Sequence, residues 1–313
     1  MPSIAAVPAT IENRAIGILW MLATMLCFIT LDSTMKYLLE SHSLIQVTWA
    51  RFFFATVIAL LASARNFRAI VYSRALGLQT VRSLFLMMTT GLFNAGIRTI
   101  PLATATTIMF LSPILVTVLS IPFLKEKVGP RRWVGVGIGF LGAVIVVQPG
   151  SGALGFGAIL LLVAAFLNAS YQLITRKVRV YDSPMTSLVY TAAAGAVVTS
   201  LIVPFYWDWP SLEGWLLFIW AGLAGGVGHL CLIQAFRHAP ASVVAPFTYS
   251  SLIWATLSGW LVFNEWPAQW TWLGAALIIG SGLYIYHRER KQDPEDERDR
   301  SDPIEIQASR AGP

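Results

Sequence analysis

Residues 98–135 read RTIPLATATTIMFLSPILVTVLSIPFLKEKVGPRRWVG, and residues 237–274 repeat this pattern without a gap as RHAPASVVAPFTYSSLIWATLSGWLVFNEWPAQWTWLG. The identities at a constant separation of 139 residues include Arg98/Arg237, Pro101/Pro240, Glu126/Glu265, Trp133/Trp272 and Gly135/Gly274. They fall on residues that begin, end or anchor helices rather than on interchangeable aliphatic residues, which argues against chance. The repeat predicts two halves with the same number of helices.

The composition is that of a membrane protein. Hydrophobic residues make up 56% of the 313 residues, charged residues 12%, and the mean hydropathy is +0.65, whereas a soluble domain carries about 25% charged residues. Eight of the 16 acidic residues lie between Glu289 and Glu305. The basic residues gather at the ends of apolar runs, where they orient a protein in a bilayer. The high pI therefore does not indicate a nucleic-acid partner.

Ten apolar runs are long enough to cross a bilayer, which requires about 20 residues for a helix. We therefore expect an all-α integral membrane protein with ten transmembrane helices and short connections. The expected spans are 15–36, 44–64, 76–98, 101–124, 132–148, 153–175, 184–206, 214–237, 239–263 and 270–286.

Basic residues at the ends of these runs predict the orientation. With a cytoplasmic amino terminus, the inner ends carry Arg14, Arg65, Arg68, Arg74, Lys125, Lys127, Arg131, Arg132, Arg176, Lys177, Arg179, Arg237, Arg288, Arg290 and Lys291. The outer ends carry only Lys36 and Arg98. We expect a multi-pass protein of the cell inner membrane with both termini in the cytoplasm.

Five spans in each half is an odd number, so the second half is expected to be inverted relative to the first. Glu126 then lies among cytoplasmic bases, while Glu265 lies outside with none beside it in the sequence. Inverted repeats of this kind are typical of alternating-access carriers with a midplane substrate site. The expected segments are a cytoplasmic stretch 1–14, a first five-helix repeat 15–148, a second, inverted repeat 152–287 and a charged, disordered cytoplasmic tail 288–313.

The chain resembles the drug/metabolite transporter superfamily in its ten-helix form with two tandem EamA domains. The resemblance rests on ARFFFATVIALL at 50–61 and on the paired blocks 100–146 and 239–285, which share a proline, helix, glutamate, tryptophan and glycine order. LDSTMKYLLE at 31–40 and VTWARF at 47–52 more loosely resemble bacterial riboflavin importers and S-adenosylmethionine carriers of that superfamily. The resemblance implies a small-metabolite carrier, with riboflavin uptake as the first hypothesis and export of S-adenosylmethionine, amino acids or other metabolites as alternatives.

Charged residues within the spans are the first candidates for a transport site, because a charge at membrane depth costs about 2.5–3.5 kcal/mol or more. Asp32 and Lys36 are four residues apart and share one face of the first helix. Two interpretations are open: an ion pair within the helix, or a site for substrate or a coupling ion. Arg51 in the second helix either joins this site or extends to the outer headgroups.

Further polar candidates fall into two layers. Aligning the first spans of the halves at 140 residues pairs Phe28 with Asn168, Asp32 with Gln172 and Lys36 with Arg176. With an inverted second half, the outer layer contains Asp32, Lys36 and Arg98, close to Asn94, and the inner layer contains Gln172, Arg176 and Arg237. These layers are either gates on the two sides of a cavity or markers of helix ends.

Other candidates come from the fourth, eighth and ninth helices. His229, which aligns with Thr90, is the one histidine well inside a span, and packing or hydrogen bonding is favoured there over proton coupling. The fourth and ninth helices carry Phe110, Ser112, Tyr249, Ser250 and Trp254 at corresponding places, either for packing or for a substrate wall. Pro113 and Pro246 are expected to interrupt these helices and free backbone carbonyls.

The sequence contains no zinc-protease motif, glycine-rich phosphate loop or acid and cysteine cluster with metal spacing. We therefore expect neither an enzyme nor a cofactor or metal; a channel ranks second to a carrier, and a membrane enzyme last. Cys27 and Cys231 are interpreted as small buried hydrophobic residues. The expected partners are a small-molecule metabolite and the lipid bilayer, with a homodimer as an option for assembly.

Overall fold

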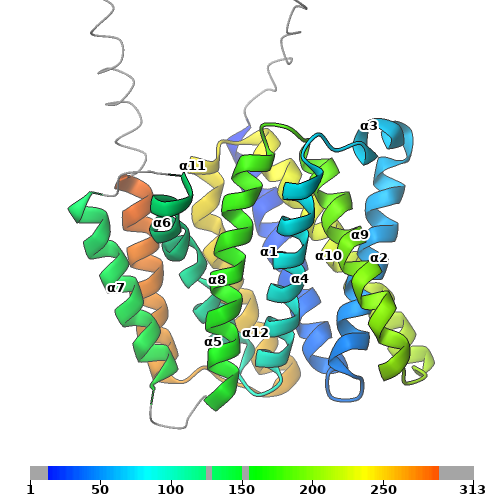
Figure 1. The fold of residues 1–313 in the computed structure, drawn as a ribbon. Coiled ribbons are helices and arrows are strands. Elements are labelled where there is room, and N and C mark those ends of the chain that lie inside the picture. Colours follow the sequence, from blue (N-terminus) through cyan, green and yellow to red (C-terminus); the bar gives the residue numbers. More distant parts are fainter. Residues whose placement is uncertain (1–12, 125–128, 150–154, 289–313) are drawn as a thin grey trace, which may run out of the picture.

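The structure is a computed structural model that describes residues 13–124, 129–149 and 155–288. All regular elements in these ranges are helices, and they stand side by side in one bundle (Figure 1). Most of the expected tails, Glu126 and its basic neighbours Lys125 and Lys127 lie outside the described residues. The all-helical expectation is confirmed for the described ranges.

The helices follow the expected spans closely. In the first half they are α1 (Arg14–Leu38), α2 (Leu44–Ser63), the 3-10 turn η1 (Ala64–Asn66), α3 (Phe67–Val71), α4 (Leu76–Ile97), α5 (Leu102–Met109), α6 (Leu111–Leu124) and α7 (Pro130–Val147). In the second half they are α8 (Gly155–Val178), α9 (Pro184–Ile202), η2 (Val203–Tyr206), α10 (Leu212–His238), α11 (Ala241–Val244), η3 (Ala245–Ser250), α12 (Ser251–Phe263) and a final helix, 269–288.

Local sequence explains where several helices begin. Ser43, Ser183 and Ser211 precede α2, α9 and α10, and each side-chain oxygen accepts a hydrogen bond from a backbone N–H in the first turn. Such caps satisfy N–H groups that have no partner within the helix. Between these caps the helices are almost uniformly apolar, and within the described ranges seven helical stretches are long and apolar enough to cross a membrane.

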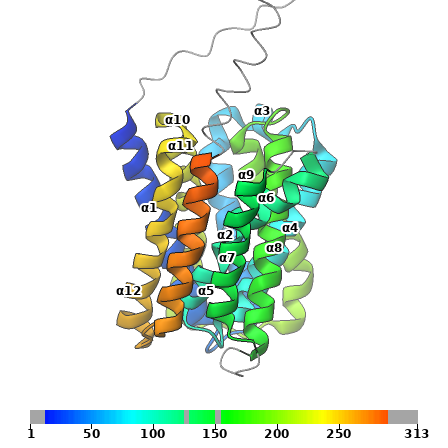
Figure 2. The ribbon, with the colours of Figure 1, turned by 90° about the vertical axis from the view of Figure 1, so that its left-hand side faces the viewer.

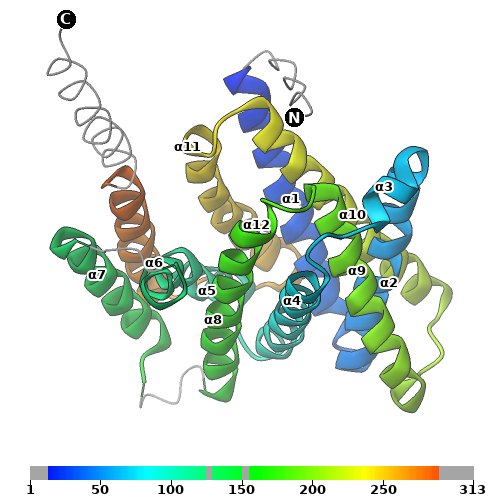
Figure 3. The same cartoon turned by 45° about the horizontal axis from the view of Figure 1, so that its top comes forward.

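Helix packing is reciprocal between the halves. α1 packs against α10 and α12, and its repeat counterpart α8 packs against α4 and α6. α2 and α9 pack against each other, and each also contacts the third helix of the other half. Figure 3 shows α7 and the final helix at one edge of the bundle, and α2, α3 and α9 at the opposite edge.

α7 and the final helix meet through glycine. A Cβ atom on Gly142 would lie 2.9 Å from the Gly274 carbonyl oxygen, and one on Gly274 would lie 2.7 Å from the Gly142 carbonyl oxygen. Any side chain at either position would therefore separate the two backbones, which is why small residues are favoured at such crossings. Figure 2 shows these two helices at the face turned toward the viewer.

α1 and α8 run in opposite directions through the bundle. α1 descends from the top of Figure 1, whereas α8 ascends from the bottom, and the start of α1 and the end of the final helix lie at the same end. Two spans are broken near their middle, as expected from Pro113 and Pro246. α5 ends at Met109 with Phe110 as its cap, and in the other half η3 separates α11 from α12. A proline lacks the N–H that a continuous helix needs.

Candidate transport site

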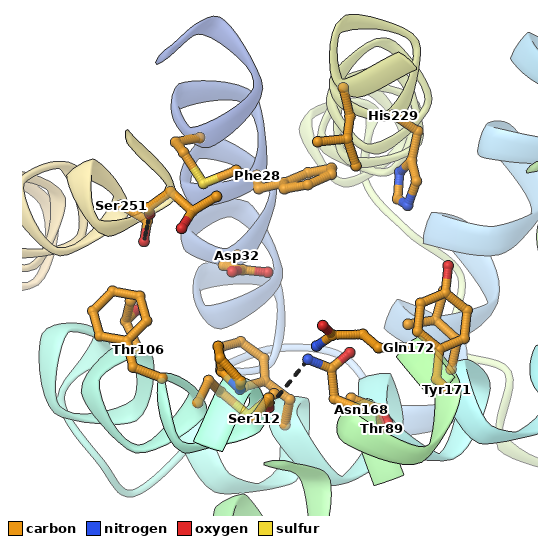
Figure 4. A pocket seen from close by; sticks show the side chains of 18 of the residues that line it. Phe28, Asp32, Thr89, Thr106, Ser112, Asn168, Tyr171, Gln172, His229 and Ser251 are labelled. Carbon is orange, nitrogen blue, oxygen red and sulfur yellow. Dashed lines mark hydrogen bonds between the residues drawn. The ribbon is translucent and has the colours of Figure 1, made fainter. Parts of the chain in front are cut away.

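A cavity of about 690 Å³ lies between the two halves. Volumes of 300–1,000 Å³ are typical of sites for small organic ligands. Its walls are mostly apolar, with a limited set of polar side chains, some of which are labelled in Figure 4. The polar lining residues include Asp32, Arg51, Thr89, Thr90, Thr106, Ser112, Asn168, Tyr171, Gln172, Thr175, His229, Thr248, Tyr249 and Ser251.

Asp32 and Arg51 supply opposite charges to this cavity. Asp32 comes from α1 and Arg51 from α2, both are half-buried, and both line the cavity. Of the two interpretations of Arg51, the structure fits the one that places its side chain at the cavity. A carboxylate accepts hydrogen bonds and a guanidinium donates them, so this pair can hold a ligand that carries both kinds of group.

α8 presents a polar stripe to the cavity. Asn168, Tyr171, Gln172 and Thr175 follow the three- and four-residue spacing that places side chains on one helix face. Asn168 Nδ2 donates to Ser112 Oγ at 3.2 Å, and Ser112 in turn donates to the Ala165 carbonyl. These bonds orient the Asn168 amide, and Figure 4 shows Asn168 and Gln172 on the cavity wall facing Asp32.

His229 faces the cavity from α10. Its Nδ1 lies 2.9 Å from the Gly225 carbonyl oxygen, which can only accept, so Nδ1 carries a hydrogen. In the neutral ring Nε2 is then left as an acceptor. Phe28 meets the imidazole edge-on, with ring centroids 4.9 Å apart. His229 is thus a polar group within an aromatic wall.

The two broken helices meet at the cavity through Phe110 and Tyr249. Their rings are in edge-to-face contact at 5.0 Å, and both line the cavity. They are also 139 residues apart, so they occupy equivalent positions in the repeat. Ser251 lines the cavity as the repeat equivalent of Ser112, so the expectation that Ser250 takes this place was one residue off.

The cavity is open toward one end of the bundle. Gln172, Arg176 and Arg179 in and after the last turns of α8, and Phe236 in α10, line it and are exposed. They lie toward the end of the bundle that holds the start of α1 and the end of the final helix. We call this the open end.

The opposite end is held together by Lys36. Its Nζ lies 2.6 Å from Glu265 Oε1 and 2.7 Å from Oε2, and it donates to the Ile100 carbonyl oxygen at 3.1 Å. The Leu102 N–H also reaches Glu265 Oε2, at 3.4 Å. These contacts join α1, the start of α5 and the segment after α12. We call this the closed end.

These contacts correct the interpretation of Asp32 and Lys36 as an ion pair within one helix, and they give Glu265 a partner. Lys36 forms its ion pair with Glu265 and not with Asp32. Its side chain extends to the segment just after α12, whereas Asp32 lines the cavity. Glu265, which has no base near it in the sequence, receives one from a helix 229 residues away. An (i, i+4) spacing places two side chains on one face but does not decide which distant partner each reaches.

Three other candidates lie outside the cavity. Asn94 is fully buried and donates to Thr48 Oγ1 between α4 and α2. Arg98 is exposed just after α4, and Arg237 is exposed near the end of α10, 3.5 Å from Gln234 Oε1 within the same helix. Arg98 therefore does not belong to the predicted outer layer with Asp32 and Lys36. Arg237 likewise does not belong to the predicted inner layer with Gln172. Their placement at helix ends fits the alternative interpretation.

Tyr171, Thr175 and Arg82 were missed in the sequence. Tyr171 and Thr175 could have been found from the spacing that links them to Asn168, since all three share one face of α8. Arg82 is a charge in the middle of an expected span, which by itself marks a functional candidate. It does not line the cavity but contacts two residues that do.

The chain matches the EamA-like transporter family twice, at residues 15–148 and at residues 155–286. The chain belongs to this family. A riboflavin transporter of Vibrio cholerae is 31% identical to this EamA-family chain over 281 residues, covering 88% of this chain and 94% of the relative. An S-adenosylmethionine uptake transporter of Rickettsia bellii is 30% identical over 282 residues, covering 90% and 97%.

A solved crystal structure shares the fold of this EamA-family chain. The TM-score is 0.62 at 17% identity, and the alignment covers 90% of this chain and 99% of the other. The family and the curated relatives identify the chain as a multi-pass membrane transporter of small molecules. Membership supports a transport function for the cavity without deciding its ligand.

Proposed function

We propose that this protein is an inner-membrane carrier of a small organic metabolite that works by alternating access. The observation that carries the proposal is the cavity with one open and one closed end. A ligand-sized space reaches the exposed residues Arg176 and Arg179, while Lys36 and Glu265 join the helices at the opposite end. A pore would need continuity through both ends, whereas a carrier exposes its site to one side at a time.

Ten spans in two inverted five-helix repeats are part of this proposal. The opposite directions of α1 and α8 and the reciprocal packing of the halves support it. Residues in equivalent positions of the two repeats also line the same cavity. Asp32 and Gln172 form one such pair, and Thr90 and His229 form another. Lys36 and its equivalent Arg176 differ, because Arg176 lines the open end while Lys36 is buried in the closed end.

With both termini in the cytoplasm, as the distribution of basic residues predicts, the open end faces the cytoplasm. The structure then corresponds to the inward-facing state of the carrier. The outward-facing state requires the Lys36–Glu265 contact to break and the walls around Arg176 to approach each other. The repeat supports such an exchange, because equivalent helices then swap environments.

Riboflavin is our first proposal for the substrate, in the direction of uptake. The cavity offers aromatic faces at Phe28, Phe110 and Tyr249 and both donors and acceptors at Arg51 and Asp32. A flat ring system with amide-like edges uses both kinds of contact. The relative from Vibrio cholerae is named a riboflavin transporter, which supports this choice.

S-adenosylmethionine is the second candidate, because relatives of similar identity are named for its uptake. Its charged groups would pair with Asp32 and Arg51. Export of an amino acid or another metabolite, in line with the wider family, is kept as a further alternative.

Uptake in a bacterial riboflavin auxotroph that lacks its own importer tests the substrate. Cells expressing the wild-type chain should accumulate labelled riboflavin and grow on low riboflavin, and cells expressing Asp32→Asn at equal level should not. The same membranes tested with labelled S-adenosylmethionine separate the two candidates. Uptake of S-adenosylmethionine without uptake of riboflavin would overturn the first choice but keep the carrier.

A further inference from the structure

Arg82 is a buried cation within the bundle and is only 4% exposed. It lies in α4, and its guanidinium reaches α8 and α9. It donates to Gln79 Oε1, the Ser187 carbonyl and Thr191 Oγ1 through Nη1, to Thr175 Oγ1 through Nε, and to Tyr171 through Nη2. All these acceptors are neutral. Burying an ion without an opposite charge is costly, so hydrogen bonds to a wide set of partners must offset this cost.

Two of these acceptors also line the cavity. Arg82 Nη2 lies 2.9 Å from the Tyr171 hydroxyl oxygen, Nε lies 2.7 Å from Thr175 Oγ1, and the guanidinium lies over the Tyr171 ring, 4.8 Å from its centre. Thr175 Oγ1 in turn donates to the Tyr171 carbonyl at 2.7 Å. The guanidinium therefore fixes both the ring and the hydroxyl of Tyr171.

The direction of the hydrogen bond to Tyr171 decides what this hydroxyl can do. A guanidinium has no acceptor, so the Tyr171 oxygen must accept from Arg82 and its hydrogen must point elsewhere. Among the residues that the structure describes, none accepts this hydrogen. The hydroxyl lines the cavity and is thus a donor available to a ligand. A charged donor on the oxygen also strengthens the outgoing hydrogen bond.

We propose that Arg82 is a positioning residue that holds the Tyr171 hydroxyl as a hydrogen-bond donor for an acceptor oxygen of the substrate, such as a carbonyl or carboxylate. This inference rests on the proposed carrier function. The cavity then has a hydrogen-bond acceptor at Asp32 and hydrogen-bond donors at Arg51 and Tyr171. A suitable substrate then combines a donor or cationic group with an acceptor or anionic group, and a purely cationic or purely apolar compound is disfavoured.

The test compares Tyr171→Phe, Arg82→Gln and the double variant, with riboflavin and S-adenosylmethionine as the probes. Binding is measured by equilibrium dialysis of purified protein, and transport in proteoliposomes gives KM and the maximal rate. We expect Tyr171→Phe to raise Kd about three- to tenfold, the range for one lost hydrogen bond. Arg82→Gln should raise it similarly, and the double variant no further than the single ones, because both remove the same contact.

Thr191→Val is the matched control. It removes another acceptor of Arg82 but does not line the cavity. We expect its melting temperature to fall while Kd stays within twofold, whereas Arg82→Lys should recover part of the affinity that Arg82→Gln loses. Unchanged affinity in Tyr171→Phe, or losses that multiply in the double variant, would overturn the proposal. Tyr171→Phe decides the matter even where Arg82→Gln fails to fold.

A ligand-independent measurement separates this inference from the choice of substrate. The difference in ultraviolet resonance Raman spectra between a protein and its Tyr171→Phe variant isolates the Tyr171 bands, which respond to hydrogen bonding at the hydroxyl. We expect these bands to shift between the wild-type and Arg82→Gln backgrounds, with the Arg82→Lys background between them. Identical bands overturn the Arg82–Tyr171 contact. Where the wild-type protein binds neither probe, the proposed substrates fail and this measurement alone decides the role of Arg82.

Discussion

Lys36 Nζ lies 2.6 Å from Glu265 Oε1, and this ion pair joins the first helix of one half to the end of the fourth helix of the other. The Lys36 side chain is 8% exposed and that of Glu265 28%. Lys36 also donates to the Ile100 carbonyl and lies 5.1 Å from the centre of the Phe263 ring. A contact between elements that separate when this end opens stabilises only the state in which it is closed.

Glu265→Gln should shift the carrier toward the state that is open at this end. We expect a change of about five- to thirtyfold in the population ratio, corresponding to about 1–2 kcal/mol for a partly exposed ion pair. A single cysteine replacing Thr106, which lines the cavity, reports the shift through its reaction with an impermeant thiol reagent. Labelling from the closed side should rise in Glu265→Gln and return toward the wild-type rate in the exchanged pair Lys36→Glu/Glu265→Lys. Equal labelling in all three proteins would argue against a gate.

Asp32 should be needed for transport independently of Lys36. We expect Asp32→Asn to lower transport about ten- to a hundredfold, because a charged acceptor at the cavity is lost. Adding Lys36→Met should not restore transport, since Lys36 pairs with Glu265. Combining Lys36→Met with Glu265→Gln should recover expression and stability relative to either single change, because no unpaired charge remains. Initial rates at equal protein level measure transport, and expression level with melting temperature measures the recovery of stability. Rescue of Asp32→Asn transport by Lys36→Met would remove Asp32 from the site.

The sequence was sufficient for the all-helical architecture, because long apolar runs with prolines and basic residues at their ends favour helices locally. It was also sufficient for Asp32, Gln172 and His229, which are polar residues in apolar surroundings and do line the cavity. It failed where the partner of a side chain is distant in the chain. The pairing of Lys36 with Glu265 and the contact of Arg82 with Tyr171 depend on how helices pack, and spacing within one helix carries no information on that.

Stability at low pH should depend on Asp182, in the turn between α8 and α9. Burial raises the pKa of this carboxyl, but hydrogen bonds from Ser73, Gln79 and the Arg74 N–H outweigh burial and hold its pKa below the ordinary value. The carboxylate therefore stabilises the fold fully above pH ~4, near the unfolded pKa. That contribution is lost as the pH falls through the lower folded pKa.

Melting temperatures in detergent between about pH 6 and pH 3 measure this dependence. The wild-type protein should lose stability on acidification more steeply than Asp182→Asn, which cannot titrate at this position. Ser73→Ala removes one of the hydrogen bonds and serves as a control, with a melting temperature between the two at pH 6. Parallel curves for the wild-type protein and Asp182→Asn would contradict the assignment.

Cys27 of α1 and Cys231 of α10 should report the contact between these helices. α1 packs along α10, and the Cys27 Cβ atom would lie 3.1 Å from a Cβ atom on Gly228, three residues before Cys231. We expect oxidation by copper phenanthroline to join them in a disulfide. With a protease site inserted between residues 150 and 154, the cut halves should stay linked after oxidation and separate on reduction. Cys231→Ser is the control, and halves that separate despite complete oxidation of the thiols would contradict the packing of α1 on α10.

Counterflow in proteoliposomes tests the carrier most directly. Purified protein is reconstituted, the vesicles are loaded with excess unlabelled riboflavin or S-adenosylmethionine, and entry of the same labelled compound is followed at a low external concentration. For one of the two compounds, we expect labelled uptake to exceed that of unloaded vesicles several-fold and to pass through a transient maximum, because a loaded site returns faster than an empty one. Uptake that is unaffected by preloading, with a rate that does not saturate, would show a pore and contradict alternating access.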